Sequence, residues 1–452
     1  MDFLDDILEN SRIDDVESSK IRKHILDLVL EYSKISHKVK NFVPGKTMVP
    51  VSGKVFDGTE LQFLISSSLD FWLTSDRFNH EFEKKLSDFL HSNFVLTTNS
   101  GSSANLLALS ALKSDELGTK SLHDGDEVIT VAAGFPTTVN PIIQNNLIPV
   151  FVDVNLGSYA IDETKIENAI SDKTKAIMLA HTLGNPFNLN RIKELCEKYD
   201  LWLIEDCCDA LGSLYDNKHV GTFGDIGTLS FFPAHHITMG EGGAVFTDNP
   251  LLKKIIESIR DWGRDCFCAP GKNNTCGKRF EWKFEQLPDG YDHKYIYSNL
   301  GYNLKITEMQ ASVGLGQLTK LAEFIQTRKE NFSYLKNELK QFEKYLFLPE
   351  STPKSEPSWF GFPITVKTTA PFSKNTLVNF LSSKLIDTRP LFAGNITKQP
   401  YFETISYRVV QNLEKTDLIM NNAFWIGIFP GLTHEMLRYV VEQFKQFFTT
   451  YE

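Results

Sequence analysis

Four cysteines are spaced in a way that suits metal binding: Cys208, Cys266, Cys268 and Cys276, with 57, one and seven residues between successive members. Thiolates bind iron–sulfur clusters or a tetrahedral zinc ion, and this spacing matches neither the bacterial nor the plant ferredoxin pattern. Cys207 competes with Cys208 for the first position, and Cys196 is interpreted as a core or surface thiol inside a helix. By itself the pattern therefore leaves both a redox cluster and a structural zinc open.

Two adjacent histidines follow an apolar run and could move protons. His235 and His236 lie between Ser230, at the end of that run, and a glycine-rich stretch that finishes at Gly243. Imidazole titrates near neutral pH, so His235 is a candidate general base. The alternative is an ordinary polar loop after a strand.

Two further strand ends offer binding groups. Gly101, Ser102 and Ser103 begin a helical pattern, where free N–H groups can receive a phosphate, although the same residues also make an ordinary helix cap. Asp206 ends another strand and could hold a pyridine nitrogen protonated. A phosphate cradle, a carboxylate and a base are thus expected at three strand ends.

The elements that would position these groups form an α/β pattern. Strands are predicted at 94–98, 127–131, 149–154, 176–181, 201–205, 227–232 and 244–247, with helical patterns between the first five. This alternation predicts a mainly parallel seven-stranded sheet covered on both faces, with ligands bound at the carboxyl ends of the strands. We predict an N-terminal helical arm at 1–60, a large domain at 61–315 and a smaller C-terminal α/β domain at 316–452.

Three features inside these domains are also predicted. In the arm, Ile21, Ile25, Leu28 and Tyr32 recur on one helix face, and a long helix is expected from about residue 301 past Phe324. Residues 262–300 are rich in Gly, Asn, Lys and Cys and interrupt the α/β rhythm. They are expected to form a long excursion, which compact domains rarely carry without a purpose.

Composition narrows the function. The chain has 452 residues, a formal net charge of −10 and no long basic stripe, so a nucleic-acid partner is not expected. The acidic N-terminus lacks the layout of a signal peptide, and no apolar run approaches the about 18 residues that span a bilayer. We therefore expect a cytoplasmic protein without a membrane anchor, in which clustered cysteines favour metal or redox work over disulfides.

Together these motifs resemble the sugar aminotransferase family named for DegT, DnrJ, EryC1 and StrS. The likeness runs from about Val49 to the C-terminus and includes the segments 301–311 and 391–395. It implies the fold-type I architecture of pyridoxal phosphate enzymes: a large mainly parallel sheet domain plus a smaller C-terminal α/β domain. In the aminotransferases a lysine stands where this chain has His235. Because imidazole cannot form a stable Schiff base, the resemblance implies pyridoxamine phosphate held without a covalent link.

Other site residues follow from the resemblance. Gly101, Ser102, Ser103 and Ser230 resemble the phosphate grip, Asp206 the pyridinium partner and Phe135 the ring stacked on the cofactor. Asn303 resembles an asparagine that reaches the neighbouring subunit's phosphate, which implies a homodimer. Asp209 stands where many relatives have histidine or glutamine, so its contact with the ring oxygen is open. Arg389 and residues 44–54 are candidates for the nucleotide diphosphate, since cations suit phosphate.

The resemblance is greatest to the 3-dehydrases of 3,6-dideoxyhexose and lipopolysaccharide biosynthesis. It implies C3 dehydration of a CDP-4-keto-6-deoxyhexose, a [2Fe–2S] cluster on Cys208, Cys266, Cys268 and Cys276, and a separate NAD(P)H-dependent flavin/iron–sulfur reductase. The alternatives are a cluster-free dehydrase that uses glutamate as amino donor, an ordinary aminotransferase, and a non-catalytic protein with a zinc-stabilised loop.

Overall fold

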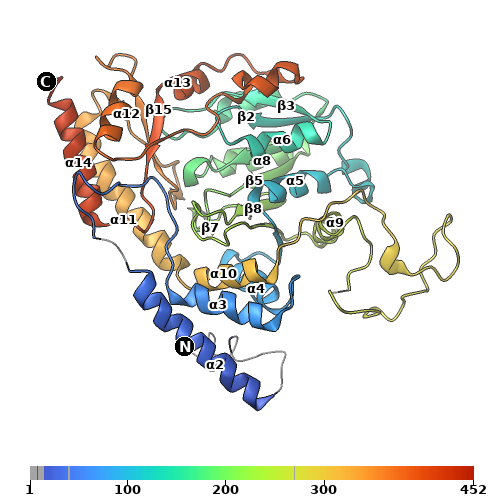
Figure 1. Cartoon of the computed structure of the whole chain (residues 1–452). Coiled ribbons are helices and arrows are strands. Elements are labelled where there is room, and N and C mark those ends of the chain that lie inside the picture. Colours follow the sequence, from blue (N-terminus) through green and yellow to red (C-terminus); the bar gives the residue numbers. More distant parts are fainter. Residues whose placement is uncertain (1–7, 9–14, 39–40, 269, 452) are drawn as a thin grey trace.

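The computed structural model describes residue 8 and residues 15–38, 41–268 and 270–451 (Figure 1). The predicted arm at 1–60 therefore lies partly outside the described residues. Within them, no helix combines the length and the apolarity that a membrane crossing requires.

A large central sheet organises the chain, and its eight strands run in the order β1-β9-β8-β5-β4-β2-β3-β14. Their bounds are β1 Phe94–Thr98, β2 Glu127–Val131, β3 Ile148–Val152, β4 Thr174–Ala180, β5 Trp202–Asp206, β8 Ile226–Ser230, β9 Gly243–Thr247 and β14 Arg408–Val409. All pairs are parallel except β8–β9 and β9–β1. The seven predicted strands are all present. The eighth, β14, has only two residues, too few to show a sequence period.

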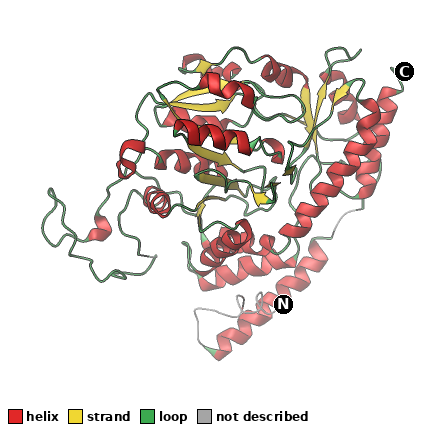
Figure 2. Cartoon of the chain, turned by 180° about the vertical axis from the view of Figure 1, so that it is seen from behind, coloured by secondary structure: helices red, strands yellow, loops and turns green. Residues whose placement is uncertain are grey.

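Alternate residues of the strands enter two different cores. Ala176, Met178 and Ile204 pack with α5 Gly101–Ala111 and α9 Pro250–Arg260 on one face. Ile177 and Leu179 face the other core, which includes residues of α4 Arg77–Leu90, α8 Leu189–Tyr199 and α10 Glu308–Leu318. Helices therefore cover the sheet on both sides, as a parallel sheet requires (Figures 1 and 2).

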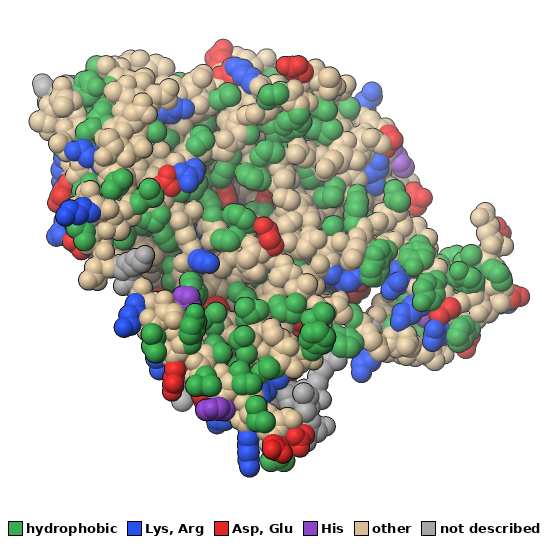
Figure 3. Space-filling model, viewed as in Figure 1, with side chains coloured by type: hydrophobic (Ala, Val, Ile, Leu, Met, Phe, Trp, Pro, Cys, Tyr) green, Lys and Arg blue, Asp and Glu red, His purple; other side chains and the backbone are tan. Residues whose placement is uncertain are grey.

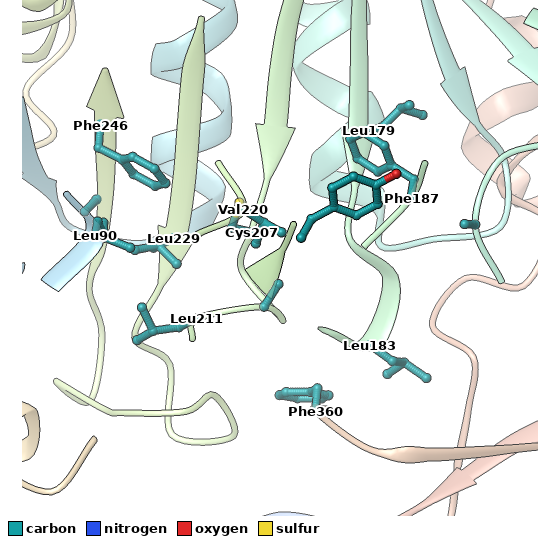
Figure 4. Close-up of a cluster of buried hydrophobic side chains, with 14 of the residues drawn as sticks. Leu90, Leu179, Leu183, Phe187, Cys207, Leu211, Val220, Leu229, Phe246 and Phe360 are labelled. Atoms are coloured by element: carbon teal, nitrogen blue, oxygen red, sulfur yellow. The ribbon is translucent and has the colours of Figure 1, made fainter. Parts of the chain in front are cut away.

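The second of these cores contains Cys207. Figure 4 shows its side chain among Leu211, Val220 and Leu229, and it is 1% exposed. Cys208, in the turn that follows β5, lines the cavity at the strand ends instead. Of the two adjacent cysteines, only Cys208 can therefore be reached by a ligand at the strand ends.

The N-terminal helix α2 spans Val16–Ser36 and lies along α3 Gly58–Asp70. Its buried residues are Arg22, Leu26 and Ser33, whereas Ile21, Leu28 and Tyr32 of the predicted face are 49–61% exposed. Arg22 decides the orientation, since its guanidinium lies 2.9 Å from the Asp70 carboxylate and 2.6 Å from the Ser66 carbonyl. A buried ion pair thus determines which side of the helix is covered.

The predicted long helix after residue 301 is two helices, α10 and α11 Leu321–Leu339, which break at Thr319 and Lys320. The break lets α10 pack on α3 and α4 while α11 packs on α14 His434–Phe448 in the C-terminal part. That part holds an antiparallel sheet in the order β10-β12-β15-β13, with β10 Leu346–Phe347, β12 Phe362–Val366, β15 Ala423–Ile426 and β13 Arg389–Pro390.

The remaining elements are short. Apart from 3-10 turns, they are α6 Pro136–Gln144, α7 Ile166–Ala169, α12 Lys374–Ser383, α13 Glu414–Asn422, and a three-stranded sheet of β6 Leu214–Tyr215, β7 Lys218–His219 and β11 Ser355–Glu356. Between α9 and α10 the chain leaves the body as an excursion (Figure 1). The described part of residues 262–300 contains no α-helix or named strand, only a 3-10 turn at His293–Tyr295.

Candidate active site

A cavity of about 630 Å³ lies at the carboxyl ends of the central strands. Ser102, Phe135, Asp206 and Ser230 follow or end four different strands and all line it. The C-terminal part adds Phe360, which lies just before β12, and Arg389 and Trp425 of its sheet, and Val51 and Ser52 come from the segment before α3. The cavity thus lies where the large sheet meets the C-terminal part.

The start of α5 approaches β8 very closely. A Cβ atom on Gly101 would lie 2.4 Å from the Cβ of Ser230 and 3.0 Å from Sγ of Cys208, so only glycine fits without a shift. The Ser103 N–H donates to Oγ of Ser100 over 3.0 Å, so Ser100 caps the helix while Gly101 and Ser102 line the cavity. The cap interpretation is correct for Ser100 and Ser103, and the exposed first turn still offers an anion site.

Asp206 stands at the end of β5 and is 5% exposed. Its Oδ2 accepts hydrogen bonds of 2.7 Å from Nδ2 of Asn105 and from Oγ1 of Thr138, and its Oδ1 accepts from the Cys208 N–H at 3.1 Å. These bonds fix the carboxylate, but none comes from a cationic group. A protonated ring nitrogen in the cavity would supply the missing positive charge.

His235 lines the cavity with a side chain that is 15% exposed. Burial, helped by the charge of Arg328, lowers the pKa of His235 to about 3, so the imidazole is neutral near pH 7. Its Nδ1 makes no hydrogen bond within the described structure and lies 3.5 Å from Oδ1 of Asp209. A neutral ring with an unpartnered nitrogen can accept a proton.

Arg328 of α11 fixes the backbone at this histidine. It is 1% exposed and donates hydrogen bonds to the carbonyls of Trp359, Phe360 and His235, the last over 3.3 Å. Burial lowers the pKa of Arg328 to about 9, which leaves it charged at neutral pH. The neighbouring His236 points elsewhere, with its Nε2 2.8 Å from the Ser358 carbonyl.

A second cluster of buried side chains near the cavity is spaced like a set of metal ligands, but its members are already engaged in hydrogen bonds with one another and with the backbone. Within the described residues, only His181, Glu205 and Cys207 bring three ligand atoms within 4.8 Å of one another. Glu205 already accepts from the N–H groups of Gly221, Phe223 and Gly224 and contacts Nε2 of His181 at 3.0 Å. This network fastens the loop after β7 and is structural.

The structure brings together most of the predicted site residues. Those that line the cavity are Gly101, Ser102, Phe135, Asp206, Cys208, Ser230, His235 and Arg389. Ser103 is turned to the helix cap, and Asn303 is exposed and outside the cavity wall. Cys266, Cys268 and Cys276 lie in the excursion, away from Cys208. Among the described residues, no three of these four thiols have sulfur atoms that all lie within 4.8 Å of one another, so a single chain presents no ready ligand set.

Comparison with known proteins shows the family to which the chain belongs. Residues 57–445 match the DegT/DnrJ/EryC1/StrS aminotransferase family. The chain belongs to this family. Its fold is that of the pyridoxal phosphate enzymes in the family: it superimposes on the E. coli GDP-4-keto-6-deoxy-D-mannose-3-dehydratase with bound hydrated PLP at a TM-score of 0.79 and 30% identity, over 88% of this chain and 100% of that one.

Two relatives within the family are more similar in sequence. The lipopolysaccharide biosynthesis protein RfbH of Salmonella typhimurium is 61% identical over 95% of this chain and 99% of its own length. The dTDP-4-dehydro-2,6-dideoxy-D-glucose 3-dehydratase of Saccharopolyspora spinosa is 48% identical over 94% of this chain and 92% of its own length. These comparisons confirm the resemblance drawn from the motifs: the chain belongs to this family, and its relatives include 3-dehydratases.

Sequence reasoning missed three residues of this family site. Asn105 and Thr138 hold Asp206, and Arg328 holds His235. Asn105 and Thr138 carried a weak signal, because each lies in the first turns of a helix that follows a predicted strand. Arg328 carried none, since a single arginine in a polar helix looks like a solvated surface residue.

Proposed function

We propose that this protein is a pyridoxamine phosphate-dependent 3-dehydratase of a nucleotide-linked 4-keto-6-deoxyhexose, with CDP as the nucleotide, in 3,6-dideoxyhexose biosynthesis. The observation that carries the proposal is the cavity wall. It presents His235 at the position that a lysine occupies in the aminotransferases, and no lysine is found among the described residues that line it. The wall thus offers a base but no amine for a covalent link.

The residues present fit this cofactor. The first turn of α5, close against Ser230, suits the phosphate, and Asp206 suits a protonated ring nitrogen. Phe135 is 52% exposed at the cavity and is available to stack on the ring. When bound, pyridoxamine phosphate supplies an amino group for the substrate's ketone and a ring that takes up electrons.

The chain's own groups then move the proton. His235, neutral at pH 7, would take up one proton on its free imidazole nitrogen and return it to the C3 hydroxyl of the sugar, which would leave as water. Arg328 holds the backbone of His235 in place during both transfers. Arg389, half exposed at the cavity wall, is available to the nucleotide diphosphate.

Dehydration in a single turnover tests the proposal. Protein loaded with pyridoxamine phosphate is mixed with the CDP-4-keto-6-deoxyhexose, and loss of water from the sugar is followed by mass spectrometry. His235→Asn should slow this step by about 10²-fold or more, because general-base catalysis contributes at least that much. His434→Asn, an exposed histidine on α14, is the matched control. A full dehydration rate in His235→Asn would refute the assignment.

His235→Lys provides a second readout. The lysine should form a covalent link with pyridoxal phosphate, trapped by borohydride and located by peptide mass, while dehydration is lost. If the wild-type chain already carried such a link on another lysine, the protein would be an aminotransferase.

The cluster-free dehydratase is the second candidate, because Cys208 and the three cysteines of the excursion do not meet within one chain. We therefore derive no reduction step from a single chain. We propose that a [2Fe–2S] cluster and an NAD(P)H-dependent reductase supply the electrons. The two candidates differ in their needs. The cluster-free enzyme would turn over with glutamate and release ammonia, whereas the proposed enzyme needs an external reductant and iron.

A further inference from the structure

The excursion leaves the body along a fixed path. Asp261 pairs with Asn303, and Arg264 pairs with Tyr297, as antiparallel bridges at its base. The two chain segments that form this base lie so close together that a Cβ on Gly263 would be 1.8 Å from the Asn299 carbonyl oxygen. The chain beyond the base is thus held out from the body (Figure 1).

Its surface is unusually apolar for a solvent-exposed loop. Phe267, Phe280, Phe284, Tyr295 and Leu300 are 40–97% exposed, and Figure 3 shows hydrophobic side chains across the projecting segment. An exposed patch of this kind marks a contact surface. The excursion therefore has the composition of an element that is covered by another surface.

Three of the four cysteines lie on this same segment. Cys268 Sγ lies 3.1 Å from the Thr275 hydroxyl. Cys276 Sγ lies 3.4 Å from Nε2 of the buried His293. Among the described residues these three sulfur atoms do not all lie within 4.8 Å of one another, so the excursion carries three of the four cysteines without a preformed site. The fourth, Cys208, lines the cavity of the body.

We propose that the metal-binding set is completed across a two-fold interface: Cys208 of one subunit joins Cys266, Cys268 and Cys276 of a second copy of this chain. A two-fold axis makes the exchange mutual, so that each excursion covers the partner's cavity and two equal sites form. Asn303, exposed at the base of the excursion and absent from its own cavity wall, then also faces the partner. The inference rests on the proposed function in taking the four cysteines as one [2Fe–2S] ligand set.

Mixed dimers test this arrangement. One subunit carries Cys208→Ser and the other carries Cys266→Ser, Cys268→Ser and Cys276→Ser, with different affinity tags. Across a two-fold interface one complete set remains, so the mixed dimer should hold half the iron and sulfide of the wild-type dimer, with the same visible spectrum. Each variant homodimer should hold almost none. Cys196→Ala, which removes a buried thiol of α8, is the control and should retain full iron.

Two results would overturn the inference. Iron in the wild-type dimer but none in the mixed dimer would place all four ligands in one chain. Full iron in the Cys208→Ser homodimer would show that Cys208 is not a ligand and that a group such as His293 completes the set.

A cross-linking measurement separates this inference from the proposed function, because it needs no metal. Chains that retain only Cys208 and Cys268 are made with ¹⁴N and with ¹⁵N, mixed after unfolding and refolding, and oxidised with copper phenanthroline. Disulfide peptides that combine both isotopes are expected. If every cross-linked peptide carried a single isotope, the proposed interface would be refuted. Mixed peptides from a protein that binds no iron would instead refute the cluster and keep the interface.

Discussion

Asp209 and His235 lie side by side in the cavity wall, with Oδ1 of the aspartate 3.5 Å from Nδ1 of the histidine, and both are neutral near pH 7. Burial, strengthened by the neighbouring charge of Asp206, raises the pKa of Asp209 to about 8, while burial lowers that of His235 to about 3. The carboxyl group therefore holds a proton where the imidazole has a free lone pair. With the proton held on Asp209, uptake of one proton by the histidine gives the pair a single positive charge.

This protonation has a measurable cost at high pH. In the unfolded chain Asp209 ionises near its ordinary pKa of 3.8, but in the folded protein it keeps its proton until about pH 8. Because the folded state binds more protons between these values, stability falls as pH rises from about 4 to 8 and then levels off. Asp209→Asn should remove this loss, which we expect to be about 2–4 kcal/mol between pH 5 and 8.

Urea unfolding of the cofactor-free protein at pH 5 and pH 8 measures the effect. Asp172→Asn, which changes an exposed aspartate, should behave as the wild type. An unchanged pH dependence in Asp209→Asn would mean that this carboxyl is already ionised at neutral pH in the folded protein.

At the scale of elements, the contact between α5 and β8 shapes the cavity. Gly101 begins the helix directly against Ser230, which ends the strand. The helix start can then present its N–H groups to the same space that receives Asp206 and His235. The distance between these two elements, more than any single side chain, sets where an anion can be held.

Gly101→Ala tests this contact. Its Cβ would overlap Ser230, so α5 must shift and pyridoxamine phosphate should bind at least about tenfold more weakly, a change of about 1.4 kcal/mol. The dissociation constant is measured by fluorescence titration. Gly316→Ala in α10, which is outside the cavity wall and where a Cβ would meet its nearest atom at 3.4 Å, is the control for the extra methyl group. If both variants bound pyridoxamine phosphate with equal affinity, the start of α5 would not be the phosphate site.

At the scale of the whole molecule, one buried arginine ties the C-terminal part to the loop that carries His235. Arg328 of α11 holds carbonyls of the segment before β12 and the carbonyl of His235 at once. His235 therefore keeps this hydrogen bond only while the C-terminal part is docked on the large sheet.

Arg328→Met should weaken both stability and catalysis. It leaves three buried carbonyls without their donor, which should lower the free energy of unfolding by about 2–4 kcal/mol. It should also lower kcat more than it changes KM, because His235 is displaced while the cavity wall remains. Arg438→Met, on the exposed side of α14, is the control. Arg328→Lys, which keeps a donor, should recover part of kcat, and loss of stability without loss of kcat would make Arg328 purely structural.

Much of the fold followed from local pattern. The seven longer strands were visible because each is a short apolar run, and the histidine segment and Asp206 were visible because they end such runs. Strand β14 and the break between α10 and α11 were not visible, since both depend on what those residues pack against. The buried side of α2 was likewise decided by an ion pair between Arg22 and Asp70, which are far apart in the chain.

The sequence by itself determined the chemical groups: an imidazole at position 235, a carboxylate at 206, and four thiols at set intervals. Side-chain type and strand-end position are local properties, so they can be recognised without coordinates. Only the tertiary structure decided that Arg328 and Asn105 support those groups, that Cys207 lies in the core, and that Cys208 stands apart from the thiols of the excursion. These are relations between distant segments, which packing alone determines.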